Sequence, residues 1–236
     1  MYSSLTVHAF LWSRNIEHGD PSLWNIMYNP RLQCGVLGDY DLSISRRQLR
    51  VPGTDRTGTI PFMARDLLSH EYWNGDIERR YRHELEACIW ILPFVFLRYQ
   101  NGESQPGTPI EAWMTADYIA CCNIKSGFLL PINLGDYEDL CQPDYKDHWR
   151  LADDLLFWLS NTSNTIAAIL RQQDAVIAQG MGKIFDEDVA SVWALFVEQL
   201  RLAAKRHSSR LGYLNTLIDD LGLEKPFWVR RDVSKA

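Results

Sequence analysis

Three oxygen-bearing side chains, Asp20, Asn25 and Asp39, surround two short apolar runs, 26–28 and 34–37. The runs are separated by a turn signal and predict a small antiparallel hairpin. Asn25 precedes its first strand and Asp39 follows its second, so pairing brings both oxygens together. Carboxylate and amide oxygens with positions left for water and phosphate suit Mg²⁺, and Asp20 could meet a hydroxyl beside that metal. The pattern predicts phosphoryl transfer.

Polar residues in this chain also have plainer interpretations. The three oxygen-bearing residues could simply cap loops. We interpret His83, on a predicted helix, as a packed or loop-bracing histidine rather than a base. The remaining histidines show no ligand spacing with any cysteine, so we expect no zinc site. Five cysteines without a C-x-x-C pair indicate reduced thiols and an intracellular protein, in the cytoplasm or nucleus.

Composition limits the class of protein. The chain has 236 residues, of which 46% are hydrophobic and 23% charged, and this is a globular profile. A formal charge of −6 argues against nucleic acid as a partner, because a duplex-binding surface needs a basic stripe. The longest apolar run, residues 87–97, is too short for a membrane span, which needs about 20 residues. We therefore predict no membrane segment and no nucleic-acid partner.

The elements that must position these side chains are mostly helices. Apolar residues at helical spacing predict helices over 2–16, 79–97, 109–121, 146–159, 165–178 and 187–206. Pro93 should kink or end the second of them, which is apolar nearly all round and therefore central. The polar stretch 42–60 predicts a long loop. We find no linker that divides the chain, so we predict a single, mainly α domain over 1–236 with one small β-hairpin.

Four sequence motifs then point to a known family. Residues 18–25, HGDPSLWN, match the catalytic-loop pattern H-x-D-x-x-x-x-N of protein kinases, and Asp39-Tyr40-Asp41 stands where D-F-G is expected. Residues 58–66, GTIPFMARD, resemble the end of an activation segment. With 81–86, YRHELE, these motifs resemble the fungal-type protein kinase family, over roughly residues 2–130.

The resemblance implies the fold of a protein-kinase C-terminal lobe and a role for each site residue. Asp20 would accept or orient the proton of the substrate hydroxyl, and Asn25 and Asp39 would hold the Mg²⁺ ions that bridge the phosphates of ATP. Thr59 would help to shape the substrate-binding end of the activation segment. Glu84 stands where the family usually has an aspartate that braces the catalytic loop.

The sequence also departs from the kinase pattern. Gly19 replaces the arginine that would grip an activation-loop phosphate, and Arg65-Asp66 replaces Pro-Glu. Only 17 residues precede His18, and all six lysines follow Asp39. We therefore expect a large lobe whose N-terminal lobe, with its phosphate-binding lysine, is missing.

These observations lead to one expected function and two alternatives. We expect a Ser/Thr-directed protein kinase lobe that uses ATP and Mg²⁺ and is inactive on its own. Its partners would be a protein substrate or a protein that covers the exposed apolar surface. A small-molecule phosphotransferase can carry the same His-Gly-Asp, but residues 58–64 argue against it. The other alternative is a non-catalytic, pseudokinase-like remnant that acts as a protein-interaction module.

Overall fold

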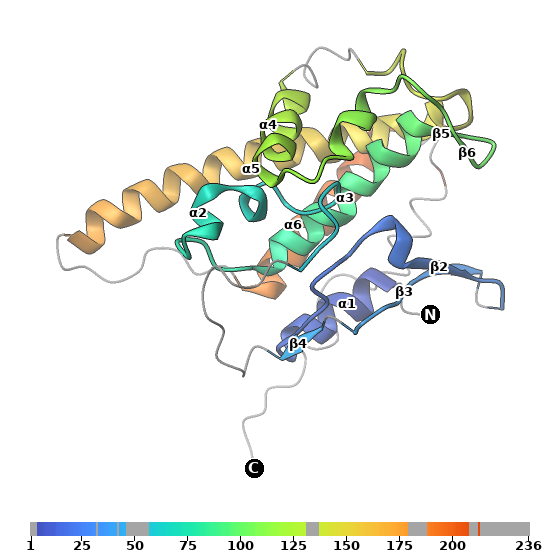
Figure 1. Cartoon of the computed structure of the whole chain (residues 1–236). Helices are drawn as coiled ribbons and strands as arrows, with labels where there is room; N and C mark the ends of the chain where they lie inside the picture. The colour runs from blue at the N-terminus through green and yellow to red at the C-terminus, as the bar shows by residue number, and fades with distance from the viewer. Residues whose placement is uncertain are drawn as a thin grey trace.

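The computed structural model describes residues 4–31, 33–41, 43–45, 57–130, 137–178, 188–207 and 212. It is mainly helical, as predicted (Figure 1). The helices are α1 (Ser4–Ser13), α2 (His70–Trp73), α3 (Tyr81–Arg98), α4 (Tyr118–Leu129), α5 (Lys146–Ala178) and α6 (Val189–Arg206). Short 3₁₀ helices are η1 (Leu23–Asn25), η2 (Asp66–Leu68), η3 (Pro109–Trp113) and η5 (Pro143–Tyr145).

Helix α3 is the centre of the core. Its residues Leu85, Ile89, Trp90 and Phe94 are almost completely buried, because α5 and α6 pack against one side and η3 against another. Pro93 lies inside the helix, which continues to Arg98, so the prediction that it could end there is wrong. Proline costs the helix one backbone hydrogen bond, and burial of the surrounding apolar residues offsets that loss.

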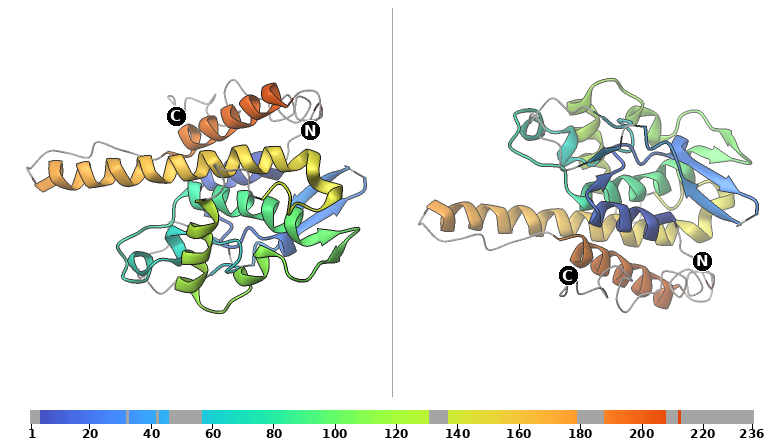
Figure 2. Two further views of the ribbon diagram at one scale, coloured as in Figure 1. Left: turned by 90° about the horizontal axis from the view of Figure 1, so that it is seen from above. Right: turned by 90° about the horizontal axis from the view of Figure 1, so that it is seen from below.

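Two predicted helix boundaries are wrong. The helix predicted over 109–121 is interrupted: η3 ends at Trp113, and α4 begins at Tyr118 because the side chain of Asp117 accepts a hydrogen bond from the amide of Ala120 (3.0 Å). The helices predicted over 146–159 and 165–178 form one helix of 33 residues, α5. Its C-terminal part projects beyond the rest of the described molecule (Figure 2).

Within the described residues, the strands form three two-stranded antiparallel sheets. Strands β2 (Ile26–Asn29) and β3 (Cys34–Leu37) form the predicted hairpin, in the register Ile26 to Leu37. Strands β5 (Tyr99–Gln100) and β6 (Glu103–Ser104) form a second hairpin at the end of α3.

The third sheet joins segments that are distant in sequence. Strand β1 (Ile16–Glu17) pairs with β4 (Ile44–Ser45), which lies inside the stretch predicted as a loop over 42–60. Most of that stretch, 46–56, lies outside the described residues.

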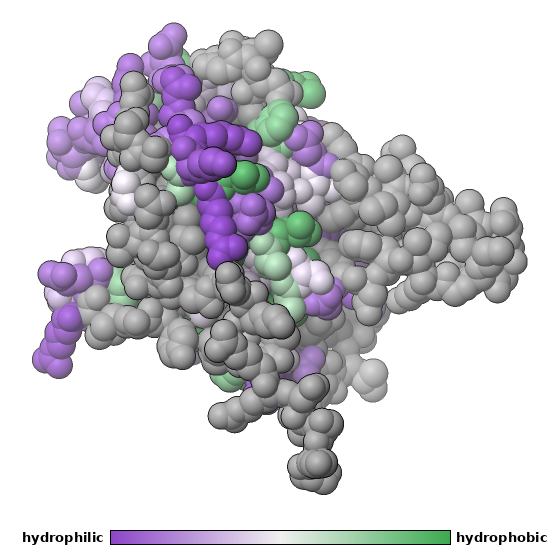
Figure 3. All heavy atoms as spheres, turned by 180° about the vertical axis from the view of Figure 1, so that it is seen from behind, coloured by the Kyte–Doolittle hydropathy of each residue, from purple (hydrophilic) through white to green (hydrophobic). Residues whose placement is uncertain are grey.

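No helix among the described residues is both long and apolar enough to cross a membrane. On the described part of the face opposite to Figure 1, hydrophobic side chains are scattered among hydrophilic ones (Figure 3). This face therefore shows no broad apolar patch in the part that the structure describes.

Candidate active site

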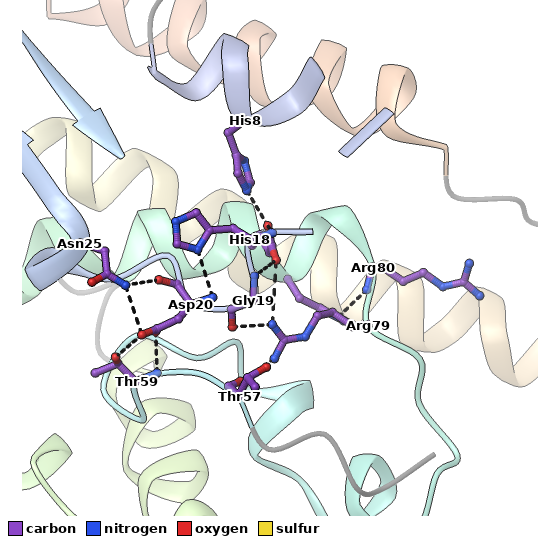
Figure 4. A network of polar contacts seen from close by, with 11 residues as sticks. His8, His18, Gly19, Asp20, Asn25, Thr57, Thr59, Arg79 and Arg80 are labelled. Carbon is purple, nitrogen blue, oxygen red and sulfur yellow. Dashed lines mark hydrogen bonds and ion pairs between the residues drawn. The ribbon is translucent and has the colours of Figure 1, made fainter. Parts of the chain in front are cut away.

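Three of the four predicted site residues meet in one hydrogen-bonded group (Figure 4). One carboxylate oxygen of Asp20 accepts from the amide of Thr59 (2.7 Å), and the other accepts from the Thr59 hydroxyl (2.8 Å). The side-chain amide of Asn25 donates to the backbone carbonyl of Asp20 (2.9 Å) and to its carboxylate (3.3 Å). The Asp20 carboxylate is thus oriented from both sides.

The backbone of the hairpin places Asp39 next to Asn25. The amide of Gly38 donates to the carbonyl of Asn25 (2.8 Å), so Asp39 follows directly at the open end of the hairpin. Its backbone is left-handed (φ 58°), a conformation that aspartate tolerates better than most residues. The exposed carboxylate of Asp39 accepts no hydrogen bond from the described part of the chain. The structure therefore brings Asp39 beside Asn25 without joining their side chains.

His18 connects the loop of residues 18–25, which carries Asp20 and Asn25, to the same hairpin end. Its Nε2 donates to the carbonyl of Gly38 (2.8 Å), while its Nδ1 accepts from the amide of Asp20 (3.2 Å). Burial lowers the pKa of His18, which favours the neutral ring that these two bonds require. The ring also contacts Tyr40, with 4.4 Å between the centroids. The ring of His18 thus joins the backbone of Asp20 to the backbone of Gly38, the residue just before Asp39.

Glu84, in the first turn of α3, braces the loop of residues 18–25 in spite of the longer side chain. Its Oε1 accepts from the amide of Gly19 (2.8 Å), and its Oε2 accepts from the amide of His18 (3.3 Å) and from Nε2 of His8 (2.5 Å). Burial opposes ionisation of Glu84, but the hydrogen bond from His8 and the charge of Arg79 lower its pKa below the ordinary value. The carboxylate is therefore ionised, and glutamate performs the bracing that the resemblance assigns to aspartate.

Arg79 is a site residue that the sequence analysis did not identify. It is 5% exposed, and it donates to the carbonyls of Gly19 (2.6 Å) and Thr57 (2.7 Å) (Figure 4). It also lies 3.9 Å from the carboxylate of Glu84. A cation is unfavourable at a helix N-terminus, so an arginine just before α3 was a signal that its partner lies elsewhere. Arg79 ties the loop of residues 18–25 to the segment that carries Thr59.

Helix α4 holds the segment that follows Thr59. The ammonium group of Lys125, which is completely buried, donates to the carbonyl of Met63 (2.6 Å). It lies 4.7 Å from the ring centre of Trp90, and burial lowers its pKa to about 8. From α3, Glu86 accepts hydrogen bonds from the amide of Arg65 (2.9 Å) and from the indole of Trp90 (3.0 Å).

His83 occupies a structural position at the start of α3. Its Nδ1 accepts from the amide of Arg80 (3.0 Å), and its Nε2 faces the carboxylate of Asp66 at 3.4 Å. Burial lowers the pKa of His83 to about 4, so the ring is neutral near pH 7. These contacts fit the packed histidine that we inferred from the sequence.

The two residues expected to bind Mg²⁺, Asn25 and Asp39, both have oxygen atoms that accept no hydrogen bond within the described structure. The structure describes no group of three or more His, Cys, Asp or Glu residues that could hold a metal ion. Asn25 uses its amide nitrogen for Asp20, which leaves its Oδ1 free within the described structure. With the free carboxylate of Asp39, this makes two side chains with hard oxygen donors at one hairpin end. The pair fits Mg²⁺, which takes few protein ligands and keeps water or phosphate for the rest.

One part of the chain matches a known protein family. Residues 1–96 match the family model described as fungal protein kinase. The matched part, which is less than half of the 236 residues, is similar to the fungal protein kinase family. The match contains Asp20, Asn25, Asp39, Thr59 and nearly all of α3, and it ends before the limit near residue 130 that the sequence resemblance suggested. No curated protein and no solved structure matches the chain.

Proposed function

We propose that this chain is a lobe of a fungal-type protein kinase and contributes the acceptor side of phosphoryl transfer from ATP to a serine or threonine hydroxyl of a protein substrate. The observation that carries the proposal is the fixed Asp20 carboxylate, which Thr59 and Asn25 hold from two sides. Oδ2 of Asp20 accepts from both Thr59 and Asn25, but Oδ1 accepts only from the amide of Thr59 in the described structure, so it keeps a lone pair for an incoming hydroxyl.

In this proposal the residues have separate tasks. Asp20 orients the acceptor hydroxyl and takes its proton as the new O–P bond forms and the bond to the leaving diphosphate breaks. Asn25 and Asp39 would hold Mg²⁺, which supplies charge neutralisation for the ATP phosphates when it is bound. Glu84 and Arg79 keep the loop in place, because both bind its backbone at Gly19. We place the protein inside the cell, where ATP is available.

Calorimetry with Mg²⁺-ATP tests the nucleotide part of the proposal. Asp39 is exposed and Asn25 partly exposed, so most of a bound nucleotide would stay in water. We expect millimolar affinity, on the order of 4 kcal/mol, that is lost in Asp39→Ala. Asp41→Ala, a neighbouring exposed carboxylate, is the matched control and should bind normally, as should Asp20→Asn. Micromolar binding that survives Asp39→Ala would place the nucleotide elsewhere and contradict the proposal.

A second candidate function is a protein-interaction module without catalysis. The observation that favours it is the exposure of apolar side chains on β2, where Met27 is 57% and Tyr28 67% exposed. A covering partner protein would bind there. Phosphate transfer to protein that disappears in Asp20→Asn would exclude this candidate. Partner binding that needs Met27 and Tyr28 but not Asp20, without such transfer, would favour it.

A further inference from the structure

Trp24 is an unusually placed tryptophan. It lies in η1 between Asp20 and Asn25, and 53% of its surface is exposed. One side of its ring rests on two completely buried rings: the centroid of Phe62 lies at 5.2 Å and that of Phe94 at 6.1 Å, both edge-to-face. The core therefore fixes the orientation of Trp24 while the rest of the indole remains in water.

The contacts of Trp24 place it next to the position of the acceptor. Its sequence neighbour Asn25 binds Asp20, and its packing neighbour Phe62 donates its amide to the carbonyl of Thr59 (2.8 Å). Thr59 in turn holds the Asp20 carboxylate. The exposed indole is thus linked to both structural supports of Asp20, through Asn25 in sequence and through Phe62 in packing. We therefore expect the residues that flank a hydroxyl at Asp20 to pass close to this ring.

We propose that Trp24 determines substrate specificity by binding an aromatic or large aliphatic side chain close to the phosphorylated serine or threonine. A fixed, half-exposed indole gains from covering its apolar surface and from edge or offset contact with a second ring. It could also attract arginine or lysine, but an exposed cation–π contact is worth less than burying a whole apolar side chain. Because Trp24 is rigid, little side-chain freedom is lost on binding. This inference rests on the proposed function, since it describes the acceptor.

Binding of short serine peptides to the full chain tests the inference without nucleotide or metal. The peptides place Phe, Leu, Ala, Arg or Glu at each position near one serine, and fluorescence anisotropy gives the dissociation constants. We expect the best Phe or Leu peptide to bind about tenfold more tightly than its Ala counterpart. Trp24→Ala should abolish this preference. Trp24→Phe should keep most of it, and this result would show that the loss in Trp24→Ala comes from the missing ring and not from unfolding of the loop. Leu195→Ala, an equally exposed apolar residue on α6, is the control and should change nothing.

Three results would overturn the inference: equal affinity for Phe and Ala peptides, a preference for Arg, or an apolar preference that survives Trp24→Ala. Asp20→Asn separates this outcome from the proposed function. We expect this variant to keep the apolar preference, because Asp20 does not contact the flanking residues. If Asp39-dependent binding of Mg²⁺-ATP fails while the Trp24-dependent preference holds, the proposed function falls and the peptide site remains.

Discussion

At the scale of single residues, the site depends on a charge that is completely buried. Glu84 is 1% exposed and binds backbone amides of the catalytic loop, with His8 and Arg79 as its charged or polar partners. A buried charge is tolerated only when it is paired and hydrogen-bonded. The position of Asp20 is therefore coupled to the ionisation of Glu84.

We expect Glu84→Gln to lower the free energy of unfolding by about 3 kcal/mol, because it leaves Arg79 as a buried cation without its carboxylate. Urea denaturation measures the effect. Glu78→Gln is the matched control, since the side chain of Glu78 is 73% exposed and pairs with Arg80 at the surface. Its effect should stay below about 0.5 kcal/mol. Equal effects of the two variants would contradict the bracing role.

His83 should make stability depend on pH. The pKa of His83 is about 4 in the folded state against an ordinary value of 6.5, so the unfolded chain binds more protons between these values. Stability should therefore fall as pH decreases from 6.5 to 4, by about 1.4 kcal/mol per pH unit from this residue. Burial of His18 acts in the same direction.

Denaturation curves recorded at several pH values test this contribution. In His83→Gln the fall in stability below pH 6.5 should be visibly shallower than in the unmodified chain. His70→Gln, at an exposed position of α2, should leave it unchanged. An identical pH dependence in His83→Gln would show that His83 is not buried in its neutral form.

At the scale of elements, α3 and α4 together determine where the segment after Thr59 runs. Glu86 and Lys125 bind its amide and carbonyl groups from two different helices. These groups would otherwise be buried without partners, at a cost of about 1–3 kcal/mol each. Through these hydrogen bonds the two helices fix the position of the segment after Thr59, and Thr59 in turn holds Asp20.

Replacement of Lys125 by methionine should loosen this segment. The carbonyl of Met63 loses its donor, so we expect a loss of about 2 kcal/mol in stability. Hydrogen exchange should become faster at the amides of Phe62 and Met63, which bind the carbonyl of Thr59. Asn123→Ala, on the exposed side of α4, serves as the control. Unchanged exchange rates at these two amides in Lys125→Met would show that α4 does not hold the segment after Thr59.

At the scale of the whole molecule, one hydrophobic core of described residues joins the segment that matches the family model to the helices that follow it. The core cluster of buried residues includes Trp12 and Phe62 from the matched part and Trp193 and Phe196 from α6. Helix α6 contacts α1, α3 and α5. A shared core predicts that both parts unfold together.

Trp193→Ala tests this coupling, because Trp193 is completely buried in α6, far in sequence from the site. We expect a loss of about 3–5 kcal/mol and one cooperative transition, seen alike by circular dichroism and by exchange at the catalytic loop. Leu195→Ala, two residues away and 55% exposed, should change stability by less than about 0.5 kcal/mol. A site that stays folded while α6 unfolds would argue for two domains and against the predicted single one.

The sequence by itself determined the features that depend on near neighbours. Asp20 and Asn25 are five residues apart, and the hairpin from β2 to β3 follows from two apolar runs and a turn, so their arrangement could be predicted without distant contacts. The helical spacing of apolar residues likewise predicted α1, α3 and α6 to within a few residues.

Only the tertiary structure decided the long-range contacts that make these residues a site. His8 meets Glu84 across 76 positions and Lys125 meets Met63 across 62, and spacing in the sequence contains no sign of either pair. Arg79 has a role only because the fold places two carbonyls around it. The break before α4 was also set by capping, through the side chain of Asp117. The physical reason is that burial gives a charged or polar group its energetic weight, and burial is a property of the assembled core.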